Sequence, residues 1–123
     1  MFNQNFMLLY VDSPSASAAF YGSLLGREPV EVSPTFALFA LDSGLMLGCW
    51  SRHTVEPAAT AAGGGGEVAF TVETASEVDQ TYREWKELGL AILQEPTDMD
   101  FGRTFVALDP DGHRLRVFAP QQE

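Results

Sequence analysis

Residues 8–26 read LLYVDSPSASAAFYGSLLG, an apolar run followed directly by the start signal of a helix. Ser13 is suited to cap the helix, and Pro14 to its first position, where a missing backbone N–H costs nothing. Apolar side chains then recur at helical spacing, at Phe20, Tyr21, Leu24 and Leu25. Gly26 can end the helix in a left-handed conformation. The stretch therefore predicts a strand over residues 6–11 joined to a helix.

The same order of signals returns in residues 68–89, VAFTVETASEVDQTYREWKELG. Thr74 and Glu77 form a capping-box pattern after the apolar run 68–72. An apolar stripe at helical spacing follows, made of Val78, Tyr82, Trp85 and Leu88. The two starts, Ser13 and Thr74, are 61 residues apart, as are Tyr21 and Tyr82. The chain is therefore built from a repeated strand–helix unit.

Each half continues with three more strand candidates: 28–32, 36–41 and 45–51 in the first, and 91–94, 104–108 and 113–119 in the second. The fold class is therefore α+β, with two βαβββ modules forming a curved eight-stranded sheet and the helices on its outer face. We expect a single domain over 1–123, with a first module of about 1–51 and a second of about 67–123. The linker 52–66 contains the flexible run AATAAGGGG.

Composition narrows the possible partners. The net charge is −10 and only seven residues are Lys or Arg, so the basic stripe of a nucleic-acid-binding protein is missing and anionic lipid is repelled. The chain contains no run of about 20 apolar residues, which is the length that would predict a membrane span. The start of the chain lacks the basic region of a signal peptide, and we expect a cytoplasmic protein. Cys49 is the only cysteine and lies in an apolar run, which predicts a buried, inert thiol.

Strand alternation predicts which side chains face away from the helices. In 6–11 both sets are apolar, so either Phe6, Leu8 and Tyr10 or the alternate set is possible. The predicted concave surface also carries Met46, Trp50, Glu67, Arg114, Arg116 and Phe118. An apolar, aromatic surface with a few polar groups is typical of a small-molecule site. The same surface is also suited to packing against a second subunit.

The doubled module resembles the vicinal-oxygen-chelate superfamily of glyoxalases, extradiol dioxygenases, fosfomycin-resistance enzymes and bleomycin-resistance proteins. The resemblance rests on residues 8–26 and on FGRTFVALDPDGHRLRVF at 101–118. Residues 28–30, Trp50 and residues 101–113 are similar to the phenazine-resistance branch of this superfamily. The DPDG sequence within the second motif is ordinary type I turn chemistry and carries no catalytic implication.

The resemblance also implies where a metal would bind. Enzymatic members of the superfamily place ligands on the first, fourth, fifth and eighth strands, which correspond here to Phe6, about Gly48, Glu67 and Arg116. Only Glu67 can ligate a metal, and a protonated arginine repels one. The two histidines, His53 in the linker and His113 on the helix side, do not restore the site. We therefore expect no metal and no cofactor.

The leading hypothesis is a non-catalytic protein that binds a planar aromatic molecule, such as a phenazine-like antibiotic, and sequesters it. Trp50 would stack on the ligand, and Arg116, with Arg103, would pair with a ligand carboxylate. Apolar walls would come from Phe6, Met46 and Phe118. Two structural roles compete with these: Trp50 can belong to a dimer interface or core, and Arg116 can form a salt bridge with Glu67.

Three other functions stay open. The first is a metal-dependent lyase or dioxygenase whose ligands lie one residue away from these positions. The second is a metal-free enzyme that uses Glu67 as a base beside Arg116. The third is an interaction module that binds no small molecule. The resemblance also implies a homodimer, in which modules are often exchanged between chains.

Overall fold

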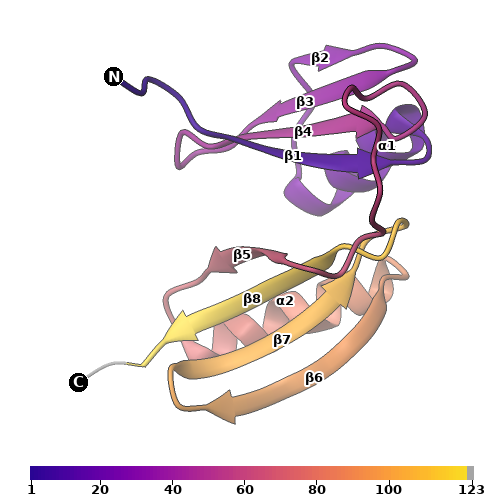
Figure 1. The fold of residues 1–123 in the computed structure, drawn as a ribbon. Helices are drawn as coiled ribbons and strands as arrows, with labels where there is room; N and C mark the ends of the chain where they lie inside the picture. The colour runs from indigo at the N-terminus through magenta and orange to yellow at the C-terminus, as the bar shows by residue number, and fades with distance from the viewer. Residues whose placement is uncertain (122–123) are drawn as a thin grey trace. The chain divides into compact units, whose positions relative to one another are not determined.

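The computed structural model describes residues 1–121 and contains two helices and eight strands. The first half holds β1 (Phe6–Val11), α1 (Pro14–Leu25), β2 (Glu31–Val32), β3 (Phe36–Ala40) and β4 (Met46–Ser51). The second half holds β5 (Glu67–Thr71), α2 (Ala75–Glu87), β6 (Ala91–Met99), β7 (Gly102–Leu108) and β8 (Arg114–Pro120). This is the predicted strand–helix–three-strand module, present twice (Figure 1).

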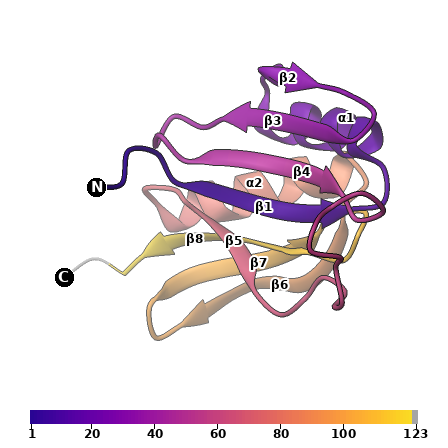
Figure 2. The ribbon, with the colours of Figure 1, turned by 45° about the horizontal axis from the view of Figure 1, so that its top comes forward.

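The chain divides into two compact units, and the division falls between Ala61 and Ala62, within the predicted linker. The first unit contains a four-stranded sheet of order β1-β4-β3-β2, with β2 at its edge (Figure 2). The pair β1–β4 is parallel, and the other two pairs are antiparallel. Helix α1 packs on β3 and β4. The core of the first unit is formed by fully buried side chains, among them Val11, Tyr21, Phe39, Leu47 and Cys49.

The second unit repeats this topology in a sheet of order β5-β8-β7-β6, again with one parallel pair, β5–β8. Helix α2 packs on β6, β7 and β8. The aromatic centre of this core is Trp85 on α2 against Phe105 on β7, with ring centroids 5.4 Å apart. The eight strands are thus divided between two four-stranded sheets, and each sheet has one face covered by its own helix (Figure 1).

The predicted helix signals are confirmed. The Ser13 side chain accepts a hydrogen bond from the backbone N–H of Ala16, and Gly26 ends α1 with φ of 65°. Thr74 accepts from the N–H of Glu77 and donates its hydroxyl to the Glu77 carboxylate. The bonds from the N–H groups of Ala16 and Glu77 satisfy backbone groups that helix ends leave unpaired.

Strands β2 and β6 differ most in length from the prediction. Strand β2 has only two residues, Glu31 and Val32. Strand β6 continues through Met99, although its second half, Glu95–Met99, carries polar residues and a proline. Register shifts between Ile92 and Gln94 and between Gln94 and Thr97 break the alternation that would have revealed it. Neither described helix is long and apolar enough to cross a membrane.

Candidate functional site

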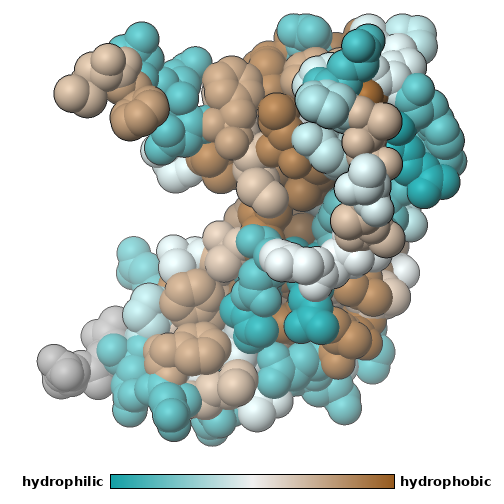
Figure 3. Space-filling view, in the orientation of Figure 1, coloured by the Kyte–Doolittle hydropathy of each residue, from teal (hydrophilic) through white to brown (hydrophobic). Residues whose placement is uncertain are grey.

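The face of the first sheet opposite α1 is almost entirely apolar, and we call it the first open face. Register pairs Phe6 with Met46, Leu8 with Gly48 and Tyr10 with Trp50 across β1 and β4. Strand β3 extends the three rows with Ala40, Leu38 and Phe36. Phe6, Leu8 and Tyr10 are 51%, 39% and 41% exposed, so they form the outward set left open by the sequence. Figure 3 shows hydrophobic side chains gathered over these strands.

Trp50 lies at one end of this face, half-buried. Its ring meets that of Phe36 edge-on, with centroids 6.3 Å apart and an interplanar angle of 89°. Gly48, at the centre, leaves room that the neighbours fill: an added Cβ would lie 2.8 Å from Leu8 Cδ2 and 3.0 Å from Phe36 Cζ. Apart from Glu31, which the register places beside Leu38 on edge strand β2, this surface consists of aromatic and aliphatic side chains and is suited to the flat face of an aromatic molecule.

The face of the second sheet opposite α2, which we call the second open face, is polar at its centre. Arg116 on β8 donates through Nε and Nη2 to the two carboxylate oxygens of Glu67 on β5. Its Nη1 donates to the Thr104 hydroxyl at 3.1 Å and to the Gln94 side-chain oxygen at 3.3 Å. The side chains of Arg116 and Glu67 are 19% and 31% exposed. The predicted salt bridge between Arg116 and Glu67 therefore forms.

Aromatic rings border this polar centre. The guanidinium carbon of Arg116 lies 5.9 Å from the centroid of the Phe101 ring, a cation–π arrangement. Phe101 in turn meets Phe118 edge-on, with centroids 5.5 Å apart. The second open face thus combines aromatic surface with the guanidinium of Arg116, which its hydrogen bonds fix in place. It can stack on an aromatic ligand and donate a hydrogen bond to it.

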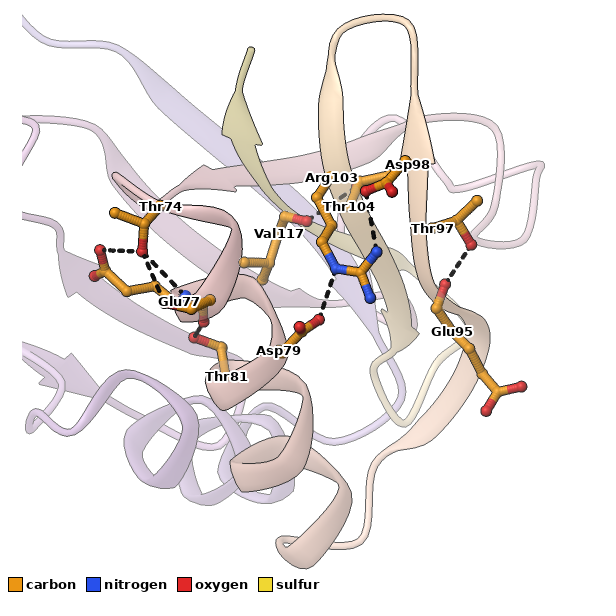
Figure 4. Close-up of polar contacts among 11 residues, drawn as sticks. Thr74, Glu77, Asp79, Thr81, Glu95, Thr97, Asp98, Arg103, Thr104 and Val117 are labelled. Atoms are coloured by element: carbon orange, nitrogen blue, oxygen red, sulfur yellow. Dashed lines mark hydrogen bonds and ion pairs between the residues drawn. The ribbon is translucent and has the colours of Figure 1, made fainter. Parts of the chain in front are cut away.

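Arg103 does not lie beside Arg116. Its register partner is Ala119, and its side chain points to the helix side of the sheet. There Nε donates to Asp79 on α2 at 2.8 Å and Nη1 to Asp98 on β6 at 3.0 Å (Figure 4). These bonds, that to Asp79 foremost, raise the pKa of Arg103. The expectation that it would support Arg116 is corrected by strand alternation, which groups it with the core residues Phe105 and Ala107.

The positions that hold metal ligands in enzymatic relatives do not offer a ligand set. In the first unit, Phe6 and Gly48 have no donor atom. In the second unit, both carboxylate oxygens of Glu67 are held by Arg116. Nowhere within residues 1–121 do three His, Cys, Asp or Glu side chains gather to hold a metal. The residues present therefore do not fit a divalent metal, because one engaged carboxylate is a poor site for such an ion.

His53 lies at the surface of the first unit, in the segment after β4. Its Nε2 lies 2.8 Å from an Asp12 carboxylate oxygen, and both side chains are exposed. This hydrogen bond lowers the pKa of Asp12. The pair joins the end of β1 to the segment after β4.

The structure places six of the seven predicted site residues on the two open faces: Phe6, Met46 and Trp50 on the first, and Glu67, Arg116 and Phe118 on the second. Sequence reasoning missed Gln94 and Thr104 as partners of Arg116, and Phe101 as its aromatic neighbour. Thr104 could have been found from strand alternation, because it lies two residues before Val106 on β7 and therefore on the same face. Gln94 follows a register shift, and Phe101 lies in a turn, so alternation gives no signal for either.

Comparisons with known proteins agree with this architecture. The family model described as the Glyoxalase/Bleomycin resistance protein/Dioxygenase superfamily matches residues 3–117. The phenazine antibiotic resistance protein EhpR of Enterobacter agglomerans is 34% identical over 116 residues, which cover 92% of this chain and 88% of that protein. Both resemblances expected from the sequence are confirmed.

Solved structures show the same fold. A protein of Agrobacterium tumefaciens known from a solution NMR structure is 57% identical, with a TM-score of 0.90 over 99% of this chain and 100% of that one. A glyoxalase-related enzyme of Fulvimarina pelagi is 22% identical, with a TM-score of 0.84 over 97% of this chain and 88% of that one. The second likeness concerns the fold alone.

Proposed function

Because the chain belongs to the glyoxalase/bleomycin resistance protein/dioxygenase superfamily, and because its metal-ligand positions carry no ligand set, we propose that it is a metal-independent binding protein. Its ligand is a small planar aromatic antibiotic of the phenazine type, which it sequesters without changing it. The first open face is the observation that carries this proposal. The similarity to a phenazine antibiotic resistance protein supports the ligand class.

Individual side chains are assigned distinct parts in binding. Trp50 stacks on the ligand, while Phe6 and Met46 provide apolar surface around it. Aromatic stacking contributes about 0.5–1.5 kcal/mol beyond the area buried. Taken by itself, the second open face offers a ligand the aromatic surface of Phe118 and a hydrogen-bond donor on Arg116, which Glu67 holds. Arg103 is left out, because its side chain lies on the helix side of the sheet.

The test is a titration with phenazine followed by tryptophan fluorescence. We expect saturable quenching, recovery of unchanged phenazine, and full binding after dialysis against a chelator. Trp50→Phe should weaken binding by about two- to tenfold, because the smaller ring offers less surface for stacking. The matched control is Trp85→Phe, which removes the core tryptophan of the second unit and leaves Trp50 as the reporter. Absence of quenching with any planar aromatic compound would overturn the proposal.

A metal-free enzyme that uses Glu67 as a base is the second candidate. Both oxygens of Glu67 accept hydrogen bonds from Arg116, so the carboxylate is already engaged within the protein. Recovery of altered phenazine, abolished by Glu67→Gln, would favour this activity over sequestration.

We also propose that the chain forms a homodimer in the cytoplasm. The exposed apolar side chains of the first open face make a second copy of the chain the rival occupant of that surface. Sedimentation across a range of protein concentrations measures the oligomeric state. A ligand-induced change in that state would show that ligand and partner compete for this face.

A further inference from the structure

The hydrogen bonds that Arg116 already makes determine how many of its N–H donors are left for a ligand. A guanidinium has five N–H donors. Four are engaged, two by Glu67, one by Gln94 and one by Thr104. The remaining N–H, on Nη2, has no acceptor among the described residues. One donor is therefore left for a ligand.

The charge of Arg116 is already compensated within the protein. Glu67 contacts the guanidinium through both of its oxygens, and the pair is mostly withdrawn from solvent. A ligand carboxylate at Nη2 would therefore meet the Glu67 carboxylate as well, and like charges at close range oppose binding. Arg114, the register partner of Glu67, is exposed, so solvent screens most of its attraction.

An uncharged acceptor meets no such repulsion. A carbonyl or amide oxygen on an aromatic ligand can accept from the free Nη2 N–H while Glu67 stays in place. The ring of Phe101, under the guanidinium, and that of Phe118 beside it provide the aromatic surface for such a ligand. The sequence predicted that Arg116 would pair with a carboxylate of the ligand. In the structure, Glu67 provides that carboxylate instead.

We propose that Glu67 is a specificity-determining residue: by neutralising Arg116, it selects planar aromatic ligands with an uncharged hydrogen-bond acceptor over those with a carboxylate. This rests on the proposed function, since it names the ligand class of the same binding protein. Glu67 acts through Arg116 and need not touch the ligand.

The test compares phenazine-2-carboxamide with phenazine-2-carboxylate by calorimetry at neutral pH. The two probes have the same shape and differ in charge, and the 2-position keeps the group from bonding to a ring nitrogen. We expect wild-type protein to bind the amide at least about tenfold more tightly than the carboxylate, because of like-charge repulsion. Glu67→Gln should improve carboxylate binding and remove most of this preference.

The matched control is Glu87→Gln, which changes the net charge equally at an exposed position on α2 and should keep the wild-type preference. Thermal unfolding verifies that each variant is folded. Equal or tighter wild-type binding of the carboxylate would overturn the role of Glu67 and leave the proposed function standing. A preference that survives Glu67→Gln would do the same. Binding of neither probe would overturn the proposed function together with this inference.

Discussion

At the scale of single residues, Gly48 decides how closely the side chains of the first open face can approach. Leu8 and Phe36 lean over it from the strands on either side, because it has no side chain of its own. The shape of the apolar surface next to Trp50 therefore depends on one missing methyl group.

Gly48→Ala should lower the free energy of unfolding by about 1 kcal/mol, the low end for overpacking, because the nearest contact is the movable tip of Leu8. The affinity for phenazine should fall more clearly, since the displaced side chains reshape the surface next to Trp50. Urea unfolding and fluorescence titration measure the two effects. Gly65→Ala, where an added Cβ meets nothing within 4 Å, is the control. Unchanged phenazine binding would place the ligand elsewhere.

At the scale of elements, the ion pairs of Arg103 connect three parts of the second unit. Its side chain on β7 contacts Asp79 on α2 and Asp98 on β6. It therefore helps to fix the helix against the sheet on the side opposite the second open face.

Arg103→Gln should cost about 0.5–1 kcal/mol of unfolding free energy, because all three partners are partly exposed and solvent weakens the pairs. It should leave ligand affinity unchanged. Urea unfolding and the phenazine titration are the measurements, with Arg83→Gln on the exposed face of α2 as control. A clear loss of affinity without loss of stability would instead return Arg103 to the binding site.

Strand alternation and helix caps explain which elements were predictable. Ser13 and Thr74 located both helix starts, because capping chemistry is local in sequence. The outward positions of Trp50 and Arg116 followed from alternation in regular strands. The contacts of Arg116 with Gln94 and Phe101 did not follow, since a register shift and a turn interrupt the pattern. Arg103 precedes the predicted strand 104–108, and only the observed start of β7 at Gly102 groups it by alternation with Phe105 rather than with Arg116.

At the scale of the whole molecule, charge is strongly unbalanced. The chain has 17 acidic and seven basic residues, for a net charge of −10. The ion pairs that form are partly exposed, so their attraction is modest. Repulsion among the unpaired carboxylates therefore opposes the folded state.

Raising sodium chloride from about 0.01 M to about 0.15 M shortens the Debye length from about 30 Å to about 8 Å. We expect the thermal midpoint to rise, because screening reduces this repulsion more than it weakens the few ion pairs. Differential scanning fluorimetry measures the midpoint, and potassium chloride at equal ionic strength is the control for specific ion binding. A lower midpoint in salt would show that ion pairs dominate the electrostatic balance.

The parallel pairing of β1 with β4 has a consequence for the order of events during translation. Strand β1 is made first in its unit but finds its hydrogen-bonding neighbour only when β4 has left the ribosome. The same delay separates β5 from β8. Because each sheet is closed by pairing within its own half, the first half has all its strands before the second is synthesised, and domains generally fold as units in this order. The apolar side chains of β1 therefore stay exposed in the nascent chain until β4 follows, and exposed apolar surface of this kind favours aggregation.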